Sequence, residues 1–190
     1  MVKELEKYGM KCVSLQEIRW KDAGTTKISQ TTIFNGECEK GHRLGTGFAV
    51  HESIIHLVKE FRDINPRIAT LTLKTDNFYM VIINVHAPTD DMEEEEKEMF
   101  YAALEDTFNQ SIEDIRLVLG DFNAKIGREE VYRSTIGSHI PHTNTNDNGI
   151  KLIDFALGKE MMVKCSHEKT YINIHGSRRM GDIKTKLTTS

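Results

Sequence analysis

The chain is short of cysteine, has no long hydrophobic run and carries no excess of positive charge, and each shortage excludes a class of protein. Its three cysteines, Cys12, Cys38 and Cys165, are odd in number and far apart, which supports neither a disulfide framework nor a zinc site. No apolar run approaches the roughly 20 residues of a membrane span. Residues 1–7 are charged and lack the hydrophobic region of a secretory signal. We therefore expect an intracellular protein, in the nucleus or the cytoplasm, with no membrane partner.

The charge balance excludes simple electrostatic binding to nucleic acid. Lysine and arginine total 25 against 29 aspartates and glutamates, a net charge of −4. Residues 175–190 are net positive, so the body of the chain is more acidic than the total indicates. Such a body does not bind a phosphate backbone through charge alone. A bound divalent cation, however, can invert the local charge.

Length and patterning predict one layered α/β domain. The 190 residues are enough for one sizeable core, and no repeat or interdomain linker is visible. Residues 68–73 and 78–85 read as two strands joined by a hairpin turn, which predicts antiparallel pairing in the sheet. Further strands are expected over residues 11–15, 27–34 and 48–50, and helices over residues 2–8 and 150–158. The glycine-rich residues 41–47 lack the Gly-Lys-Ser/Thr ending of a nucleotide-binding loop.

Two helices are expected to cover the sheet. Asp90 or Asp91 is expected to cap the first, and the acidic residues 93–96 are interpreted as its solvated first turn, where acids favour the helix dipole, and not as a metal site. Apolar side chains at helical spacing predict the buried faces of both helices. These faces comprise Met99, Phe100, Ala103, Leu104 and Phe108 in the first helix, and Leu152, Ile153, Phe155, Ala156 and Leu157 in the second.

The apolar residues 117–119 run into Gly120, Asp121, Phe122 and Asn123. The run reads as a buried strand, and side-chain alternation predicts that Asp121 and Asn123 point the same way while Phe122 turns into the core. A carboxylate beside an amide that can donate to a phosphate oxygen suits phosphodiester hydrolysis. The alternative at this point is a strand followed by an ordinary Asp/Asn turn.

Two more strand ends carry polar groups, and together the three resemble a known family. These segments are residues 15–17 (Leu-Gln-Glu), 84–89 (Asn-Val-His-Ala-Pro-Thr) and 120–124 (Gly-Asp-Phe-Asn-Ala). In order and flanks they resemble the endonuclease/exonuclease/phosphatase superfamily. The likeness is greatest to its branch of non-LTR retrotransposon endonuclease domains and related craniofacial development protein 2-like sequences. Residues 45–48, 67–68 and 146–149 extend it over most of residues 4–165.

The resemblance implies a four-layered α/β sandwich of two mixed sheets flanked by helices, and hydrolysis of a DNA phosphodiester. By the same resemblance, Glu17 would hold Mg²⁺ or Mn²⁺, hard cations that prefer oxygen ligands. Asp121 would orient or deprotonate the attacking water, and Asn123 would donate to a phosphate oxygen. His86 stands where many members have tyrosine and could donate to phosphate, with a charge that depends on pH. Arg19 would contact phosphate or pair with a local acid. No protein partner can be inferred.

Two parts of the family pattern are missing from the sequence. The family has a strand bearing a site asparagine before the helix that starts here at Val2, and it closes with an Asn-Gln-Ile-Asp-His segment. Neither is found here, so we expect a domain over residues 1–174 that lacks its first and last strands. Reading back-translated codons one base out of frame restores the closing motifs, which predicts that residues 175–190 are a frameshifted, disordered tail.

These departures leave three interpretations of function. The first is a metal-dependent DNA endonuclease domain of retrotransposon descent that is inactive in this form. The second is a catalytically dead remnant or binding module. The third is a phosphatase or nuclease of other specificity in the same superfamily, because a fold does not determine the substrate.

Overall fold

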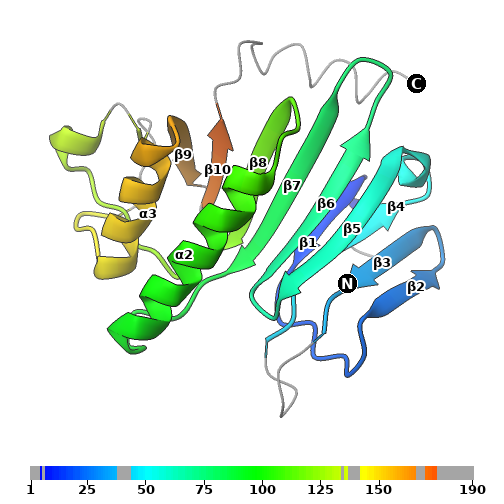
Figure 1. Cartoon of the computed structure of the whole chain (residues 1–190), viewed down its shortest axis with the longest axis horizontal. Coiled ribbons are helices and arrows are strands. Elements are labelled where there is room, and N and C mark those ends of the chain that lie inside the picture. Colours follow the sequence, from blue (N-terminus) through cyan, green and yellow to red (C-terminus); the bar gives the residue numbers. More distant parts are fainter. Residues whose placement is uncertain are drawn as a thin grey trace.

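The chain folds around two β-sheets, as the resemblance predicted (Figure 1). The computed structural model describes Leu5 and residues 7–37, 44–133, 135–136, 142–165 and 170–174. One sheet has the strand order β1-β4-β3-β2 and is antiparallel throughout. Its strands are β1 (Cys12–Leu15), β2 (Gly24–Ile28), β3 (Thr31–Asn35) and β4 (Gly47–His51).

The second sheet is mixed and has the order β5-β6-β7-β8-β10-β9. Its strands are β5 (Val58–Asn65), β6 (Ile68–Lys74), β7 (Tyr79–His86), β8 (Ile115–Asp121), β9 (Met161–Cys165) and β10 (Thr170–Ile174). Two short 3₁₀ helices, η1 (Ile55–Leu57) and η2 (Glu130–Tyr132), lie in connections. The strands β6 and β7 form the predicted hairpin.

The strands β7 and β8 form the parallel pair of this sheet, and helix α2 (Glu94–Gln110) is the crossover between them. A parallel pair needs such a crossover because the chain must return to the same end of the sheet before the second strand begins. The register places His86 opposite Asp121, so both strands end at the same edge. The polar residues that follow the two strands are brought together for this reason.

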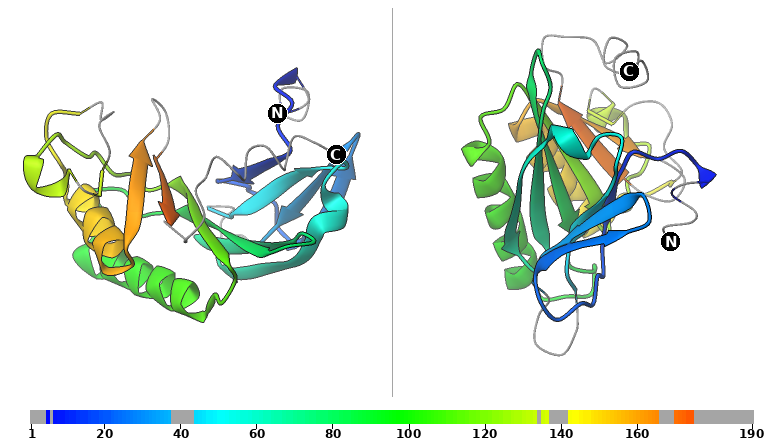
Figure 2. Two further views of the ribbon diagram at one scale, coloured as in Figure 1. Left: turned by 90° about the horizontal axis from the view of Figure 1, so that it is seen from above. Right: turned by 90° about the vertical axis from the view of Figure 1, so that its right-hand side faces the viewer.

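Each face of the six-stranded sheet buries a different layer. Helix α2 and helix α3 (Asp147–Gly158) cover one face, and the four-stranded sheet covers the other (Figures 1 and 2). Alternation along β7 accounts for this: Ile83 and Val85 pack with the helices, whereas Met80 and Ile82 pack toward the four-stranded sheet. The cluster of Phe108, Phe155 and their neighbours continues the helical layer.

The outer face of the four-stranded sheet is also partly covered. Leu15, Ile33 and Ala49 are buried there, with Leu5 packed against them. Leu5 belongs to the helix predicted over residues 2–8, of which residues 2–4 and 6 lie outside the described residues. Residues 175–190, expected to be a frameshifted tail, lie outside them as well, and the absence of a first and last strand stays a prediction.

Several expected elements differ from the structure. Residues 27–34 form not one strand but the end of β2, a turn with Ser29 in the left-handed region (φ 54°), and β3. The strands β5, β9 and β10 were not predicted. The strand β5 lies at the edge of the sheet and is exposed along much of its length. Its charged residues interrupt the apolar pattern by which a strand is predicted from sequence.

The caps and buried faces of the helices also need correction. Helix α2 begins at Glu94, and neither Asp90 nor Asp91 caps it. Met99 and Leu157, predicted to be buried, are 67% and 47% exposed. The buried face of α2 instead includes the charged residue Lys97, which is 6% exposed. Among the described residues, no helix is both long and apolar enough to cross a membrane.

Candidate functional site

The candidate site lies where β7 and β8 end side by side. The Ala87 amide donates to the Asp121 carbonyl at 2.8 Å, which continues the parallel pairing beyond His86. His86 is buried and Asp121 is half-buried. Gly120, the residue before Asp121 in β8, has a φ of +144°. A Cβ atom there would stand 1.9 Å from the Val85 carbonyl oxygen, so only glycine allows β8 to approach β7 this closely.

Asn123 is held beside Asp121 by a turn and not by strand geometry. The strand β8 ends at Asp121, and Asn123 follows it in the left-handed region with φ +48°. Its backbone amide donates to Asp121 Oδ1 at 3.0 Å, and its side-chain Nδ2 donates to the Ala87 carbonyl at 2.8 Å. Phe122 is 1% exposed, as predicted. The structure therefore contains the Asp/Asn turn that was one of the two expectations. The same turn holds the carboxylate of Asp121 close to Asn123.

An asparagine inside β7 ties the Glu17 loop to this edge. Asn84 is fully buried, and its Nδ2 donates to the carbonyls of Leu15 and Gly47, each at 2.8 Å. Its Oδ1 accepts a hydrogen bond from Gln16 Nε2 at 2.7 Å. These bonds join the two sheets. Because Glu17 follows Gln16 in the chain, the same bonds place Glu17 on the side where β7 ends. Sequence reasoning assigned no role to Asn84, although an amide in the middle of an apolar strand was a visible signal.

Glu17 itself is exposed and paired with an arginine. Its φ is +56°, and its Oε2 lies 3.2 Å from Arg19 Nη2, with both side chains more than half exposed. The structure therefore shows the ion pair with a local acid that was one of the two expectations for Arg19. An exposed pair of this kind contributes little to stability, so Arg19 can exchange its partner at small cost.

The residues present fit a weakly held hard cation. Within the described part of the chain, no three histidine, cysteine or acidic side chains gather in a way that could hold a metal ion. Mg²⁺ needs no such cage, since it keeps several waters and is commonly bound by one or two carboxylates together with substrate phosphates. The exposed carboxylate of Glu17 suits that minimal donor set.

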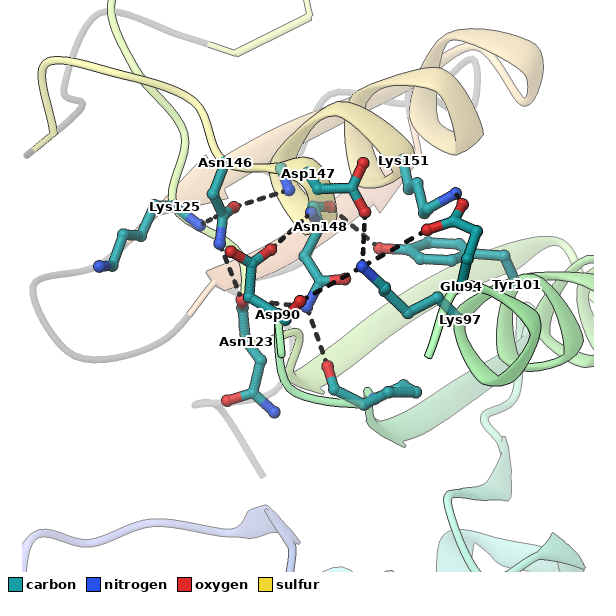
Figure 3. A network of polar contacts seen from close by, with 12 residues as sticks. Asp90, Glu94, Lys97, Tyr101, Asn123, Lys125, Asn146, Asp147, Asn148 and Lys151 are labelled. Atoms are coloured by element: carbon teal, nitrogen blue, oxygen red, sulfur yellow. Dashed lines mark hydrogen bonds and ion pairs between the residues drawn. The ribbon is translucent and has the colours of Figure 1, made fainter. Parts of the chain in front are cut away.

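A buried polar network supports the Asn123 loop (Figure 3). Asn148 is fully buried, and its Nδ2 donates to the carbonyls of Pro88 at 2.9 Å and Asn123 at 3.3 Å. Asn146 caps α3 by accepting from the Gly149 amide at 2.9 Å. The two asparagines were recognised only as part of a resemblance, and their contacts with the segments after β7 and β8 were not foreseen.

The same network contains the buried lysine of α2. Lys97 Nζ lies 2.8 Å from Asp147 Oδ2 and 3.3 Å from the Asp90 carbonyl oxygen, and also pairs with Glu94 at 3.4 Å (Figure 3). The hydrogen bond from Lys97 lowers the pKa of Asp147, and the bond to Asp147 raises the pKa of Lys97. Lys151 forms a close ion pair with Glu94 and lowers the pKa of that carboxyl group. This network clamps the N-terminal ends of α2 and α3 together behind the site.

We expect Asp147→Asn to lower Tm at pH 7 by about 3–6 °C, because it leaves the buried Lys97 ammonium with one carboxylate fewer. The folded-state pKa of Asp147 is lowered, so its stabilisation is present above the unfolded pKa of this carboxyl group and is lost as pH falls through the folded value. The difference in Tm between wild type and variant should therefore shrink below about pH 4. Thermal melts from pH 3 to 8 measure it.

Asp154→Asn is the matched control, because Asp154 is an exposed acid on the same helix. A variant of Asp147 that melts like the Asp154 control at every pH would contradict the assigned role of the Lys97 network.

Comparisons with known proteins agree with the fold. No protein-family model matches the chain. Craniofacial development protein 2 of Tragulus javanicus is 24% identical over 161 residues, and that of Bos taurus 23% identical over 161 residues; each match covers 84% of this chain. The chain spans only 28% and 27% of the length of these two relatives.

Two solved structures share the fold. The endonuclease domain of TRAS1, a telomere-specific non-LTR retrotransposon, matches with a TM-score of 0.61 at 8% identity, over 92% of this chain and 76% of that domain. The AP endonuclease LMAP from Leishmania major also gives 0.61, at 10% identity, over 91% and 72% of the two chains. With the sequence relatives, they confirm the predicted resemblance to the endonuclease/exonuclease/phosphatase superfamily.

Proposed function

We propose that this chain is a metal-dependent phosphodiesterase domain of retrotransposon descent whose substrate is DNA. The observation that carries the proposal is the joint placement of His86, Asp121 and Asn123 where the parallel strands β7 and β8 end, held by the Ala87 backbone. Both structural neighbours support it, since each is an endonuclease and one belongs to a non-LTR retrotransposon.

Each side chain has a role that its position permits. The half-buried carboxylate of Asp121 orients the attacking water and accepts its proton. The amide of Asn123 carries two N–H groups. One is bonded to Ala87, and the other is assigned to a phosphate oxygen. The imidazole of His86 donates to the same phosphate.

Glu17 would hold Mg²⁺ or Mn²⁺ at this edge. When bound, the ion neutralises the scissile phosphate and stabilises the charge of the departing oxygen. Arg19 then exchanges its contact with Glu17 for one with a neighbouring phosphate, where its planar guanidinium can donate two hydrogen bonds.

We expect turnover to be low. The family's closing motif ends in an Asp-His pair, and the sequence contains no Asp-His dipeptide. Electrostatic and acid–base groups each contribute factors of about 10²–10⁴ to the rate. A second candidate function is a domain that binds DNA and metal without cleaving.

Nicking of supercoiled plasmid with Mg²⁺ tests the proposal. We expect slow nicking that EDTA stops and that Asp121→Asn lowers by about 100-fold or more, because the acceptor of the water proton is lost. The control is Asp76→Asn in the turn between β6 and β7, at the end of these strands away from the site, which should nick like wild type.

Nicking that persists in Asp121→Asn would overturn the assignment of this residue. Binding of plasmid without nicking would instead establish the second candidate. Release of phosphate from a phosphomonoester, with no nicking, would point to a phosphatase of the same superfamily.

A further inference from the structure

The loop after β1 presents the single tryptophan of the chain three positions after Glu17. We propose that Trp20 stacks on an unstacked DNA base next to the phosphate handled by Glu17 and Asp121, and that the chain therefore prefers DNA with an exposed base to intact duplex. The inference rests on the proposed function and specifies its substrate class. Residues 18–22 are called the tryptophan loop below.

The tryptophan loop is held at both ends. The Ile18 amide donates to the Gly45 carbonyl at 3.0 Å, and the Ile18 side chain packs against the outer face of the four-stranded sheet. At the other end, the buried side chain of Asn35 donates to the Asp22 carbonyl at 2.7 Å. The Trp20 amide donates to the Ile18 carbonyl at 2.8 Å, which makes a tight turn. A loop held in this way presents its side chains with little ordering cost on binding.

Trp20 lies exposed between two cations. Its side chain is 39% exposed, and Arg19 and Lys21 on either side are exposed as well. Single exposed apolar residues are ordinary on protein surfaces. Trp20 differs in its place, since it lies three positions after Glu17 along the chain, a reach of at most about 11 Å. That is the span of about three stacked base pairs at 3.4 Å.

The side chains of the tryptophan loop favour contact with a nucleobase over contact with the DNA phosphate backbone alone. Residues 17–22 contain two acids and two bases, so the segment has no net charge to attract phosphates at a distance. An indole instead stacks on the π-face that every nucleobase has. In duplex DNA these faces are covered by neighbouring base pairs, and only a single strand, an end, a gap or a flipped base exposes them. Arg19 and Lys21 are then placed to contact the flanking phosphates.

Fluorescence of Trp20 provides a direct test, because the chain has one tryptophan. The full chain is titrated in Mg²⁺ with a ten-nucleotide oligothymidylate and, at the same nucleotide concentration, with a duplex long enough that its ends are a negligible fraction of its length. We expect the single strand to quench most of the emission and the duplex to quench little. Trp20→Ala should weaken single-strand binding by about 5–100-fold, measured by anisotropy of a labelled oligonucleotide, while Trp20→Phe retains most of it.

Tyr8→Ala is the matched control, since Tyr8 is an aromatic residue that is 67% exposed outside the tryptophan loop, and it should bind like wild type. Equal quenching by duplex and single strand, or none by either, would overturn the inference. So would an emission shift that depends on protein concentration without DNA, which would indicate contact between copies of the chain. Stacking requires no hydrolysis, so loss of nicking with quenching intact contradicts only the proposed catalysis, and the reverse result contradicts only this inference.

Discussion

Gly120→Ala is expected to lower the free energy of unfolding by more than about 4 kcal/mol. Gly120 lies in β8 with φ +144°, a conformation that costs a residue with a side chain about 1–3 kcal/mol. The added Cβ would also stand 1.9 Å from the Val85 oxygen and 2.8 Å from the Val85 nitrogen and carbonyl carbon. These are backbone atoms of the neighbouring strand, so no side chain can rotate away. We expect a loss above about 4 kcal/mol, a large part of a typical total stability of 5–15 kcal/mol.

Urea denaturation followed by circular dichroism measures this effect. Gly158→Ala is the matched control, because no heavy atom lies within 4 Å of the position a Cβ would take at the end of α3. Alanine there should leave stability unchanged or raise it by up to about 1 kcal/mol. If Gly120→Ala unfolds at the same urea concentration as wild type, the close approach of β7 and β8 at the site is wrong.

Asn84→Ala is expected to lower stability by about 3 kcal/mol and Tm by about 6–12 °C. The variant removes the two hydrogen bonds to the Leu15 and Gly47 carbonyls, in a fully buried position between the sheets. It also removes the acceptor for Gln16, the residue before Glu17. Each buried polar group left without a partner costs about 1–3 kcal/mol, so the effect exceeds the loss of a surface amide.

Asn77→Ala, in the exposed turn between β6 and β7, is the control and should change Tm by no more than about 2 °C. A differential scanning calorimetry trace for each variant gives the comparison directly. Equal melting temperatures for the two variants would show that Asn84 does not join the sheets. A second readout is metal titration, since loosening of Gln16 should weaken binding of Mn²⁺ at Glu17.

Local pattern was sufficient to predict much of the secondary structure. The apolar run that became β7 is long and nearly uninterrupted, the shorter run of β8 stops at Gly120, and the hairpin turn before β7 has strong turn residues. The local pattern failed to predict burial where that burial depends on residues distant in the sequence. Lys97 is buried because Asp147 and the Asp90 carbonyl meet it from other segments, and no periodic rule places a lysine on the inner face of a helix. The strand β5 is exposed along much of its length, so its sequence carries no apolar pattern that would predict a strand.

The sequence by itself determined which chemical groups are available: the acid at 17, the imidazole at 86, and the acid and amide at 121 and 123. The tertiary structure decided that β7 and β8 run in parallel, that Gly120 lets them meet closely, and that Asn84 joins the two sheets. These features depend on hydrogen bonds and close contacts between residues tens of positions apart, which short-range hydrophobic periodicity does not encode.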